Sequence, residues 1–246
     1  YSNKAEFISL WAGYVQKVVD RFGDYIDYWE VGNEVNTWWN KVRPDKTRFE
    51  AIVYSEMLYK AYTIIKEADS TDTVILSSLV NIDKSSQGLD PFQALSEMGS
   101  AQPGNYCDAI ALHLYWPGRD PDEAIRTLVR GRETYLTMEE YVKLFITESD
   151  RILGQRKPIW ITEVGYDFEQ MGPLMNRYGL KLEDLQATML IKSYVTLLSI
   201  PEVQGVFWYT WHNDETGQYF NLLEAGKNAY GTLSTVLAGS QALGRQ

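Results

Sequence analysis

The chain has 246 residues, of which 45% are hydrophobic and 23% charged, and its formal net charge is −10. This composition is typical of a globular protein, and the length fits one domain over residues 1–246, as in many α/β barrels. The acidic balance and the lack of a Lys/Arg cluster exclude a nucleic-acid partner, because phosphate contacts need clustered positive charge. No run approaches the roughly 18 consecutive apolar residues of a membrane span, so no membrane partner is expected either.

Six helices are predicted where apolar residues recur at helical spacing. Their ranges are 4–21, 48–68, 91–98, 138–153, 182–199 and 228–238. Asp90 and Pro91 suit the cap and the first turn of the third helix. Segments 37–46 and 165–179 are interpreted as loops, and a turn at 116–118 is followed by a long polar segment that leads to the helix at 138–153.

Five compact apolar runs are predicted to be strands. They cover residues 25–31, 73–79, 107–115, 157–162 and 205–210. Each run is apolar throughout, which is typical of strands buried on both faces of a parallel sheet. Strands alternate with helices at about 40 to 50 residues per unit, the pattern of a parallel sheet with crossover helices.

Residues suited to binding and catalysis gather at or just beyond the ends of these strands. They are Asn33, Glu34, Asn81, His113, Tyr115, Glu163, Trp208 and Trp211. In a TIM (β/α)8 barrel the carboxyl ends of the strands converge on one mouth, where active sites are built. The predicted fold class is therefore α/β, of the TIM-barrel type.

Two strands run directly into a glutamate. One ends in Val31-Gly32-Asn33-Glu34 and the other in Ile161-Thr162-Glu163. Two carboxyl groups held ~5–5.5 Å apart can act as general acid/base and nucleophile on a glycosidic bond, with retention of configuration. Taken singly, each glutamate also has a structural interpretation, since acidic residues favour helix N-termini. The aromatic content of 13% fits stacking on sugar rings as well as core packing.

These motifs resemble those of the clan A retaining glycoside hydrolases, a group of (β/α)8 barrels that includes cellulases, β-xylosidases and β-glycanases. Trp29 to Glu34 resembles their strand four, and Trp160 to Gly165 resembles strand seven. Asp108 to Tyr115 looks like strand six, and Phe207 to Trp211 looks like strand eight. The resemblance runs from the helix before strand four to the final helix.

The resemblance implies a glycosidase that cleaves a poly- or oligosaccharide by double displacement, as in polysaccharide degradation. Glu34 would be the acid/base and would have to stay protonated near neutral pH, while Glu163 would be the ionised nucleophile. The substrate-binding residues that the resemblance implies are Asn33 at the sugar 2-OH, His113 and Tyr115, one of which would orient Glu163, and Trp208 or Trp211 under the sugar. Trp38, in the loop after the first strand, is expected to be a further aromatic platform for sugar.

Several of these assignments have alternatives. His113 could be a hydrogen-bonded core histidine, and Tyr115 could be a packing residue. Trp208 and Trp211 cannot be distinguished, because a one-residue shift of the strand end exchanges which of them faces the mouth. His212 and Asp214 are more easily read as surface-loop residues.

No metal and no organic cofactor are expected. Cys107 is the single cysteine, which excludes an intrachain disulfide and a cysteine metal site. No Gly-x-Gly-x-x-Gly or Walker-type loop follows a predicted strand, which argues against nucleotide-binding folds. There is no signal peptide, but the chain starts at Tyr1 without a methionine. The compartment therefore stays open, and an extracellular or periplasmic parent protein is compatible with the sequence.

The barrel is expected to be incomplete. The strands match four to eight of an eight-strand plan, and strands one to three, with the clan's strand-two arginine, have no counterpart. The chain would then be a fragment or a naturally incomplete barrel, and its two exposed edges would favour self-association or pairing with a missing N-terminal segment. The alternative function is a non-catalytic carbohydrate-binding barrel fragment, because carboxylate placement suffers first in an incomplete barrel. The sugar, the linkage and the exo or endo action stay open.

Overall fold

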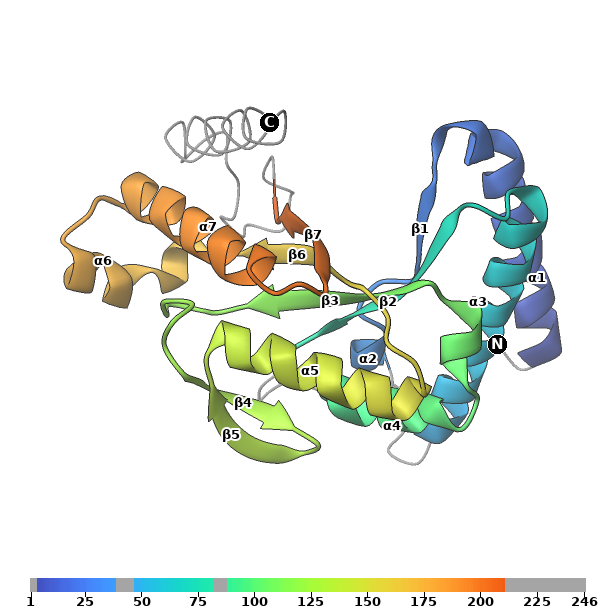
Figure 1. Ribbon diagram of the computed structural model, residues 1–246, viewed down its shortest axis with the longest axis horizontal. Coiled ribbons are helices and arrows are strands. Elements are labelled where there is room, and N and C mark those ends of the chain that lie inside the picture. The colour runs from blue at the N-terminus through green and yellow to red at the C-terminus, as the bar shows by residue number, and fades with distance from the viewer. Residues whose placement is uncertain (1–3, 39–46, 82–87, 211–246) are drawn as a thin grey trace. The chain divides into compact units, whose positions relative to one another are not determined.

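The computed structural model describes residues 4–38, 47–81 and 88–210 (Figure 1). The chain divides into two compact units. The first unit comprises Tyr1–His113, Thr127–Thr134 and Lys143–Trp160, and the second comprises Leu114–Arg126, Tyr135–Val142 and Ile161–Gln246. The single domain predicted from the length stays a prediction.

The central feature is a five-stranded parallel half-barrel sheet. Its strands are β1 (Tyr28–Val31), β2 (Thr73–Val80), β3 (Ala109–Tyr115), β6 (Ile159–Gly165) and β7 (Val203–Trp208), hydrogen-bonded in the order β1-β2-β3-β6-β7. In the first unit β1 pairs with β2 from Tyr28 opposite Thr73 to Val31 opposite Leu76. The predicted α/β fold of the TIM-barrel type is confirmed, with five parallel strands in the described part of the chain.

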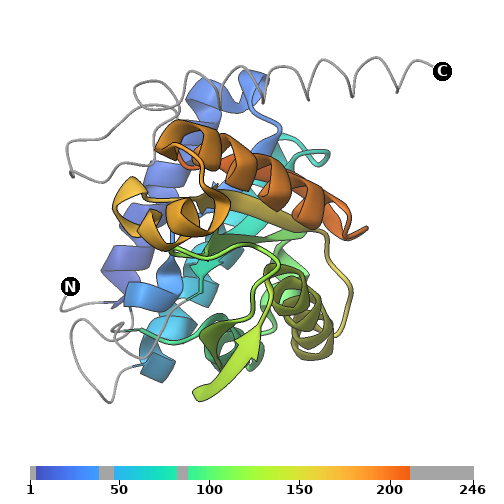
Figure 2. The same ribbon diagram turned by 90° about the vertical axis from the view of Figure 1, so that its left-hand side faces the viewer.

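The first unit contains α1 (Lys4–Phe22), α2 (Val35–Trp38), α3 (Thr47–Ala68), η1 (Gly23–Tyr25), α4 (Pro91–Gly99), η2 (Pro103–Tyr106) and most of α5 (Met138–Leu153). Helix α1 packs on α3, and helices α3 and α4 contact each other and strand β2. Helices α1 and α3 run side by side in both views (Figures 1 and 2), and Trp11 Nε1 donates to the carbonyl of Met57 at 2.9 Å. No described helix has the length and hydropathy needed to cross a bilayer.

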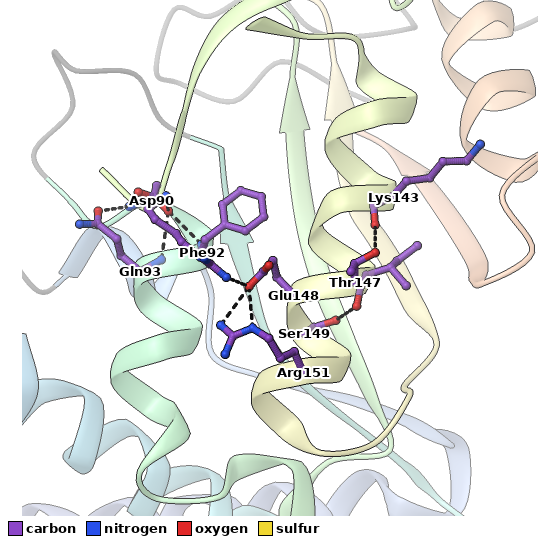
Figure 3. A network of polar contacts seen from close by, with 10 residues as sticks. Asp90, Phe92, Gln93, Lys143, Thr147, Glu148, Ser149 and Arg151 are labelled. Atoms are coloured by element: carbon purple, nitrogen blue, oxygen red, sulfur yellow. Dashed lines mark hydrogen bonds and ion pairs between the residues drawn. The ribbon is translucent and has the colours of Figure 1, made fainter. Parts of the chain in front are cut away.

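Helix α4 begins at the predicted cap. Asp90 is fully buried, and its side chain accepts hydrogen bonds from the amides of Phe92 and Gln93, while the Gln93 side chain accepts from the Asp90 amide (Figure 3). Such a capping box satisfies the amide groups that a helix start leaves without partners. The predicted start of this helix is confirmed.

The segment 116–137, predicted to be polar loop and turn, contains a hairpin. Strands β4 (Ile125–Val129) and β5 (Arg132–Leu136) form a separate two-stranded sheet. Its turn places Arg130 at φ 53° and Gly131 at φ 73°, and both amides donate to the carboxylate of Asp90. The sequence pattern predicted only a turn and a polar segment here, because the hairpin depends on hydrogen bonds to Asp90, a residue distant in sequence.

In the described part of the chain, the second unit contains strand β7 and three helices. The helices are η3 (Phe168–Gln170), α6 (Gly172–Tyr178) and α7 (Leu182–Leu198). The first two lie within 165–179, which had been predicted to be loop. Helix α6 ends at Gly179, whose positive φ of 63° stops it. Both helices are too short for apolar residues to recur at helical spacing, so the sequence pattern does not reveal them. The predicted helix at 228–238 lies outside the described residues.

A buried carboxylate joins the elements of the second unit. Asp120 is 1% exposed and receives Lys192 Nζ of α7 at 2.6 and 2.7 Å, the hydroxyl of Tyr178 of α6, and the amide of Asp122. Burial raises the pKa of Asp120, but these hydrogen bonds outweigh burial and hold the pKa below its usual range.

Strand β1 is shorter than predicted and lies at the edge of the sheet. Tyr28 is 54% exposed, so β1 is not buried on both faces as its apolar composition suggested. Beside it lies a cavity of about 290 Å³ lined by residues of α1, β1 and α3, including Tyr14 and Trp29. Pairing of the β1 and β7 edges with another chain stays a prediction.

Candidate functional site

Glu34 follows β1 in a strained backbone conformation. Its φ is 48°, in the left-handed region that side chains other than glycine adopt at a cost of about 1 kcal/mol. The Glu34 carbonyl accepts from the amide of Thr37 at 2.8 Å and from its hydroxyl at 2.9 Å, and the Glu34 amide donates to Ser78 Oγ at 3.2 Å. A strained residue whose backbone amide and carbonyl are both fixed by hydrogen bonds is characteristic of functional sites.

Gly32 lets the chain leave β1 toward Glu34. Its φ is 100°, and an added Cβ would lie 3.1 Å from Val35 Cγ1 and 3.3 Å from Ser77 Oγ. Because a side chain would be both strained and crowded here, glycine is required. The strand therefore breaks two residues before the carboxylate.

The side chain of Glu34 contacts His113. His113 Nδ1 lies 3.0 Å from Glu34 Oε1, and the imidazole is 1% exposed while the glutamate side chain is 29% exposed. Two arrangements satisfy this contact: Nδ1–H donating to a carboxylate, or a protonated Glu34 donating to Nδ1. His113 is therefore a buried, hydrogen-bonded histidine whose partner is the predicted acid/base, and its role in substrate binding stays a prediction.

Asn36 is a supporting residue that sequence reasoning missed. It is fully buried, its amide donates to the carbonyls of Val80 at 2.9 Å and Leu89 at 2.8 Å, and its carbonyl accepts from the amide of Val80 at 3.0 Å. These bonds tie the residues after Glu34 to the end of β2. Its position two residues after Glu34 gave no sign of these partners, which lie far along the chain.

In the second unit, Tyr115 contacts Glu163. The Tyr115 hydroxyl donates to Glu163 Oε2, and the Tyr115 ring lies edge-on to Tyr209 with centroids 6.4 Å apart. Glu163 lies within β6 rather than after its end, because β6 extends to Gly165. Tyr115, one of the two residues proposed to orient Glu163, donates a hydrogen bond to it.

Trp208 has packing contacts in the second unit. Its ring stacks on Tyr166, with centroids 6.2 Å apart and planes 17° apart, and it lies against Ala187 and Leu190 of α7. Tyr194, in the same cluster, is largely buried, and burial raises its pKa to about 12, so its hydroxyl stays neutral at physiological pH. The predicted sugar contact of Trp208 stays a prediction.

The other predicted site residues fall into two groups. Asn33 is exposed beside Glu34, with its side chain open to solvent. The side chain of Trp38, and the residues Trp211, His212 and Asp214, lie outside the described part of the chain. The roles assigned to these residues stay predictions.

No protein-family model matches the sequence, and no curated protein matches it. Solved structures do match. They include the β-glucosidase of Thermotoga maritima in complex with galacto-hydroximolactam (TM-score 0.62, 10% identity, 95% of this chain and 68% of that chain). A psychrophilic glycoside hydrolase family 10 endo-β-1,4-xylanase also matches (TM-score 0.57, 19% identity, 94% of this chain and 68% of that chain).

The GH53 catalytic domain of Ignisphaera aggregans matches with a TM-score of 0.58 and 14% identity over 84% of this chain. The fold is glycosidase-like. This chain spans 54% of that domain's length, in line with five strands of an eight-strand barrel. Identities this low establish the fold alone.

Proposed function

We propose that this chain carries the catalytic residues of a retaining β-glycoside hydrolase acting on a poly- or oligosaccharide. One observation carries the proposal: Glu34, just after β1, and Glu163, near the end of β6, each have a hydrogen-bonding partner on β3. His113 contacts Glu34, and Tyr115 contacts Glu163. Two carboxyl groups held in different environments are what glycoside hydrolysis requires.

Glu163 would be the nucleophile. The Tyr115 hydroxyl donates to Oε2 and so orients the carboxylate that would attack the anomeric carbon. Attack breaks the bond to the leaving-group oxygen and forms a covalent glycosyl–enzyme intermediate. Water then attacks the same carbon and releases Glu163, with net retention of configuration.

Glu34 would be the general acid/base. It would protonate the leaving-group oxygen in the first step and remove a proton from the attacking water in the second. The contact with His113 fixes Oε1 and leaves Oε2 for the substrate. Asn33, which is exposed beside Glu34, would bond the sugar 2-OH.

The test uses Glu34→Gln and Glu163→Gln on a panel of aryl β-glycosides. Each should lose at least ~10²-fold in kcat, since each removes a group that acts in the transition state. Proton NMR of the wild-type reaction should show the β-anomer as the first product. Glu67→Gln and Glu169→Gln, which change exposed carboxylates of the first and second unit, are the matched controls.

Azide distinguishes the two glutamates. With an activated substrate it should accelerate Glu34→Ala, because the small anion attacks the glycosyl–enzyme intermediate without needing a base. The same anion should not restore retaining turnover to Glu163→Ala, which forms no such intermediate. Full activity of both glutamine variants would refute the assignment.

The second candidate is a carbohydrate-binding protein without catalysis. It is favoured because this chain spans only 54% of the length of the GH53 domain, and carboxylate placement suffers first in an incomplete barrel. Saccharides would then quench tryptophan fluorescence of the wild-type chain while no glycoside is hydrolysed. Hydrolysis that depends on Glu34 and Glu163 would exclude it.

A further inference from the structure

Strand β2 carries a bulge next to Glu34. The register with β3 shifts between Leu76 and Leu79, and the two residues within the shift, Ser77 and Ser78, are fully buried. A bulge removes backbone groups from the regular ladder, so they need other partners. Side chains provide them: the amide of Ser77 donates to the Tyr54 hydroxyl at 2.8 Å, and that of Ser78 donates to Glu30 Oε1 at 2.8 Å.

Ser78 also touches the predicted acid/base. Its Oγ accepts the hydrogen bond from the Glu34 amide at 3.2 Å. The contacts therefore run from the carboxylate of Glu30, through the backbone and hydroxyl of Ser78, to the strained backbone of Glu34. All three residues belong to the first unit.

We propose that Glu30 and Ser78 are positioning residues that hold Glu34 in its left-handed conformation and so aim its carboxyl group. The proposal rests on the proposed role of Glu34 as acid/base. Glu30 fixes the bulge by accepting the Ser78 amide, and the bulge places the Ser78 hydroxyl where it accepts the Glu34 amide. Neither residue needs to touch substrate.

The position of Glu30 in β1 supports its role as a positioning residue for Glu34. It is a half-buried carboxylate in the middle of the four-residue strand β1, where an apolar side chain would cost less. Its carboxylate accepts the amide of Ser78, the bulge residue whose hydroxyl accepts the Glu34 amide. Ser77 is equally buried, but its hydroxyl donates to the carbonyl of Ser78 at 3.1 Å, so Ser77 is a natural control.

Hydrogen exchange at the Glu34 amide tests the positioning without any substrate. In Ser78→Ala and Glu30→Ala this amide should exchange at least about fivefold faster, because a protecting hydrogen bond is lost or misaligned. Glu30→Gln keeps a side-chain oxygen that can accept the Ser78 amide and should restore most of the protection. Ser77→Ala should leave it unchanged, and unchanged exchange in Ser78→Ala would overturn the proposal.

The leaving-group dependence of hydrolysis tests the link to catalysis. Ser78→Ala should lower kcat/KM for an alkyl β-glycoside, which needs proton donation, by about 10- to 100-fold. For a 2,4-dinitrophenyl β-glycoside, whose leaving group needs no proton, the loss should stay below about threefold, since the acid contributes little there. Equal losses on both substrates, or the same pattern in Ser77→Ala, would indicate a merely structural role.

The two readouts separate the two claims. A wild-type chain that hydrolyses no glycoside refutes the proposed function, and hydrogen exchange still decides whether Glu30 and Ser78 hold Glu34. Active wild-type protein with unchanged Glu34 exchange in Ser78→Ala leaves the proposed function standing and refutes the positioning role.

Discussion

His113 Nδ1 lies 3.0 Å from Glu34 Oε1, and the imidazole that makes this contact is almost completely buried. A buried ring cannot swing away from its partner, so it fixes one oxygen of the carboxyl group. This gives the predicted acid/base a defined orientation in the first unit alone.

Replacing His113 should therefore impair proton transfer. We expect His113→Ala to lower kcat/KM for substrates with poor leaving groups by about 10- to 100-fold and to alter the pH–rate profile. His113→Asn, whose amide can donate near the position of Nδ1, should retain more activity. Unchanged pH dependence in His113→Ala would contradict a role in proton transfer.

Loss of the Tyr115 hydroxyl should weaken the proposed nucleophile. Tyr115→Phe removes the donor to Glu163 Oε2 and keeps the ring that packs on Tyr209. We expect kcat to fall by about 10- to 100-fold, with little change in melting temperature. Tyr135→Phe, which alters a residue that is 67% exposed in the same unit, is the control. Equal activities of the two variants would argue against orientation of Glu163 by Tyr115.

Asp90 should be a large contributor to the stability of the first unit. Its carboxylate accepts four backbone amides, from the start of α4 and from the turn between β4 and β5. Asp90→Ala should lower the free energy of unfolding by about 2–3 kcal/mol, because buried amides lose their partners. Asp90→Asn, which keeps one acceptor oxygen, should cost less, and urea denaturation measures both.

Asp120 should make stability sensitive to acid. Its hydrogen bonds hold its folded pKa below the unfolded value, so the folded state binds fewer protons. The resulting stability is present above the unfolded pKa, roughly 4, and is lost as pH falls through the lower folded pKa. Wild-type protein should therefore lose unfolding free energy between about pH 5 and pH 2.

The variant Asp120→Asn distinguishes the contribution of Asp120 to this pH dependence from that of the other carboxylates. It should lower the unfolding free energy at pH 7 by ~3 kcal/mol, because Lys192 loses a buried partner, and it should make the acid dependence shallower. Asp122→Asn is the control, since Asp122 contacts the same lysine but is 69% exposed. The same pH dependence in wild type and Asp120→Asn would contradict the assignment.

Cys107 should be unreactive in the folded protein. Burial raises the pKa of its thiol to about 12, so very little thiolate exists at pH 8. Iodoacetamide should label the native chain at pH 8 at least about 10²-fold more slowly than the urea-unfolded chain. Mass spectrometry measures both rates, and rapid labelling of native protein would show that Cys107 is accessible.

Local pattern was enough to predict most helices and the parallel sheet. The cap at Asp90, the long apolar faces and the breaks at glycine and proline are encoded within a few residues, so their bounds agree closely with the structure. The placement of Glu34 at a strand end also followed from sequence, because an apolar run that stops at Gly32 ends the strand.

Only the tertiary structure decided which side chains meet. His113 and Tyr115 are alternate residues of one strand, and nothing local assigns the first to Glu34 and the second to Glu163. That pairing, the Ser77–Ser78 bulge and the hairpin held by Asp90 depend on strand register and on partners far apart along the chain. Sequence periodicity reports which face of an element is apolar, whereas contacts between distant residues exist only once the sheet has formed.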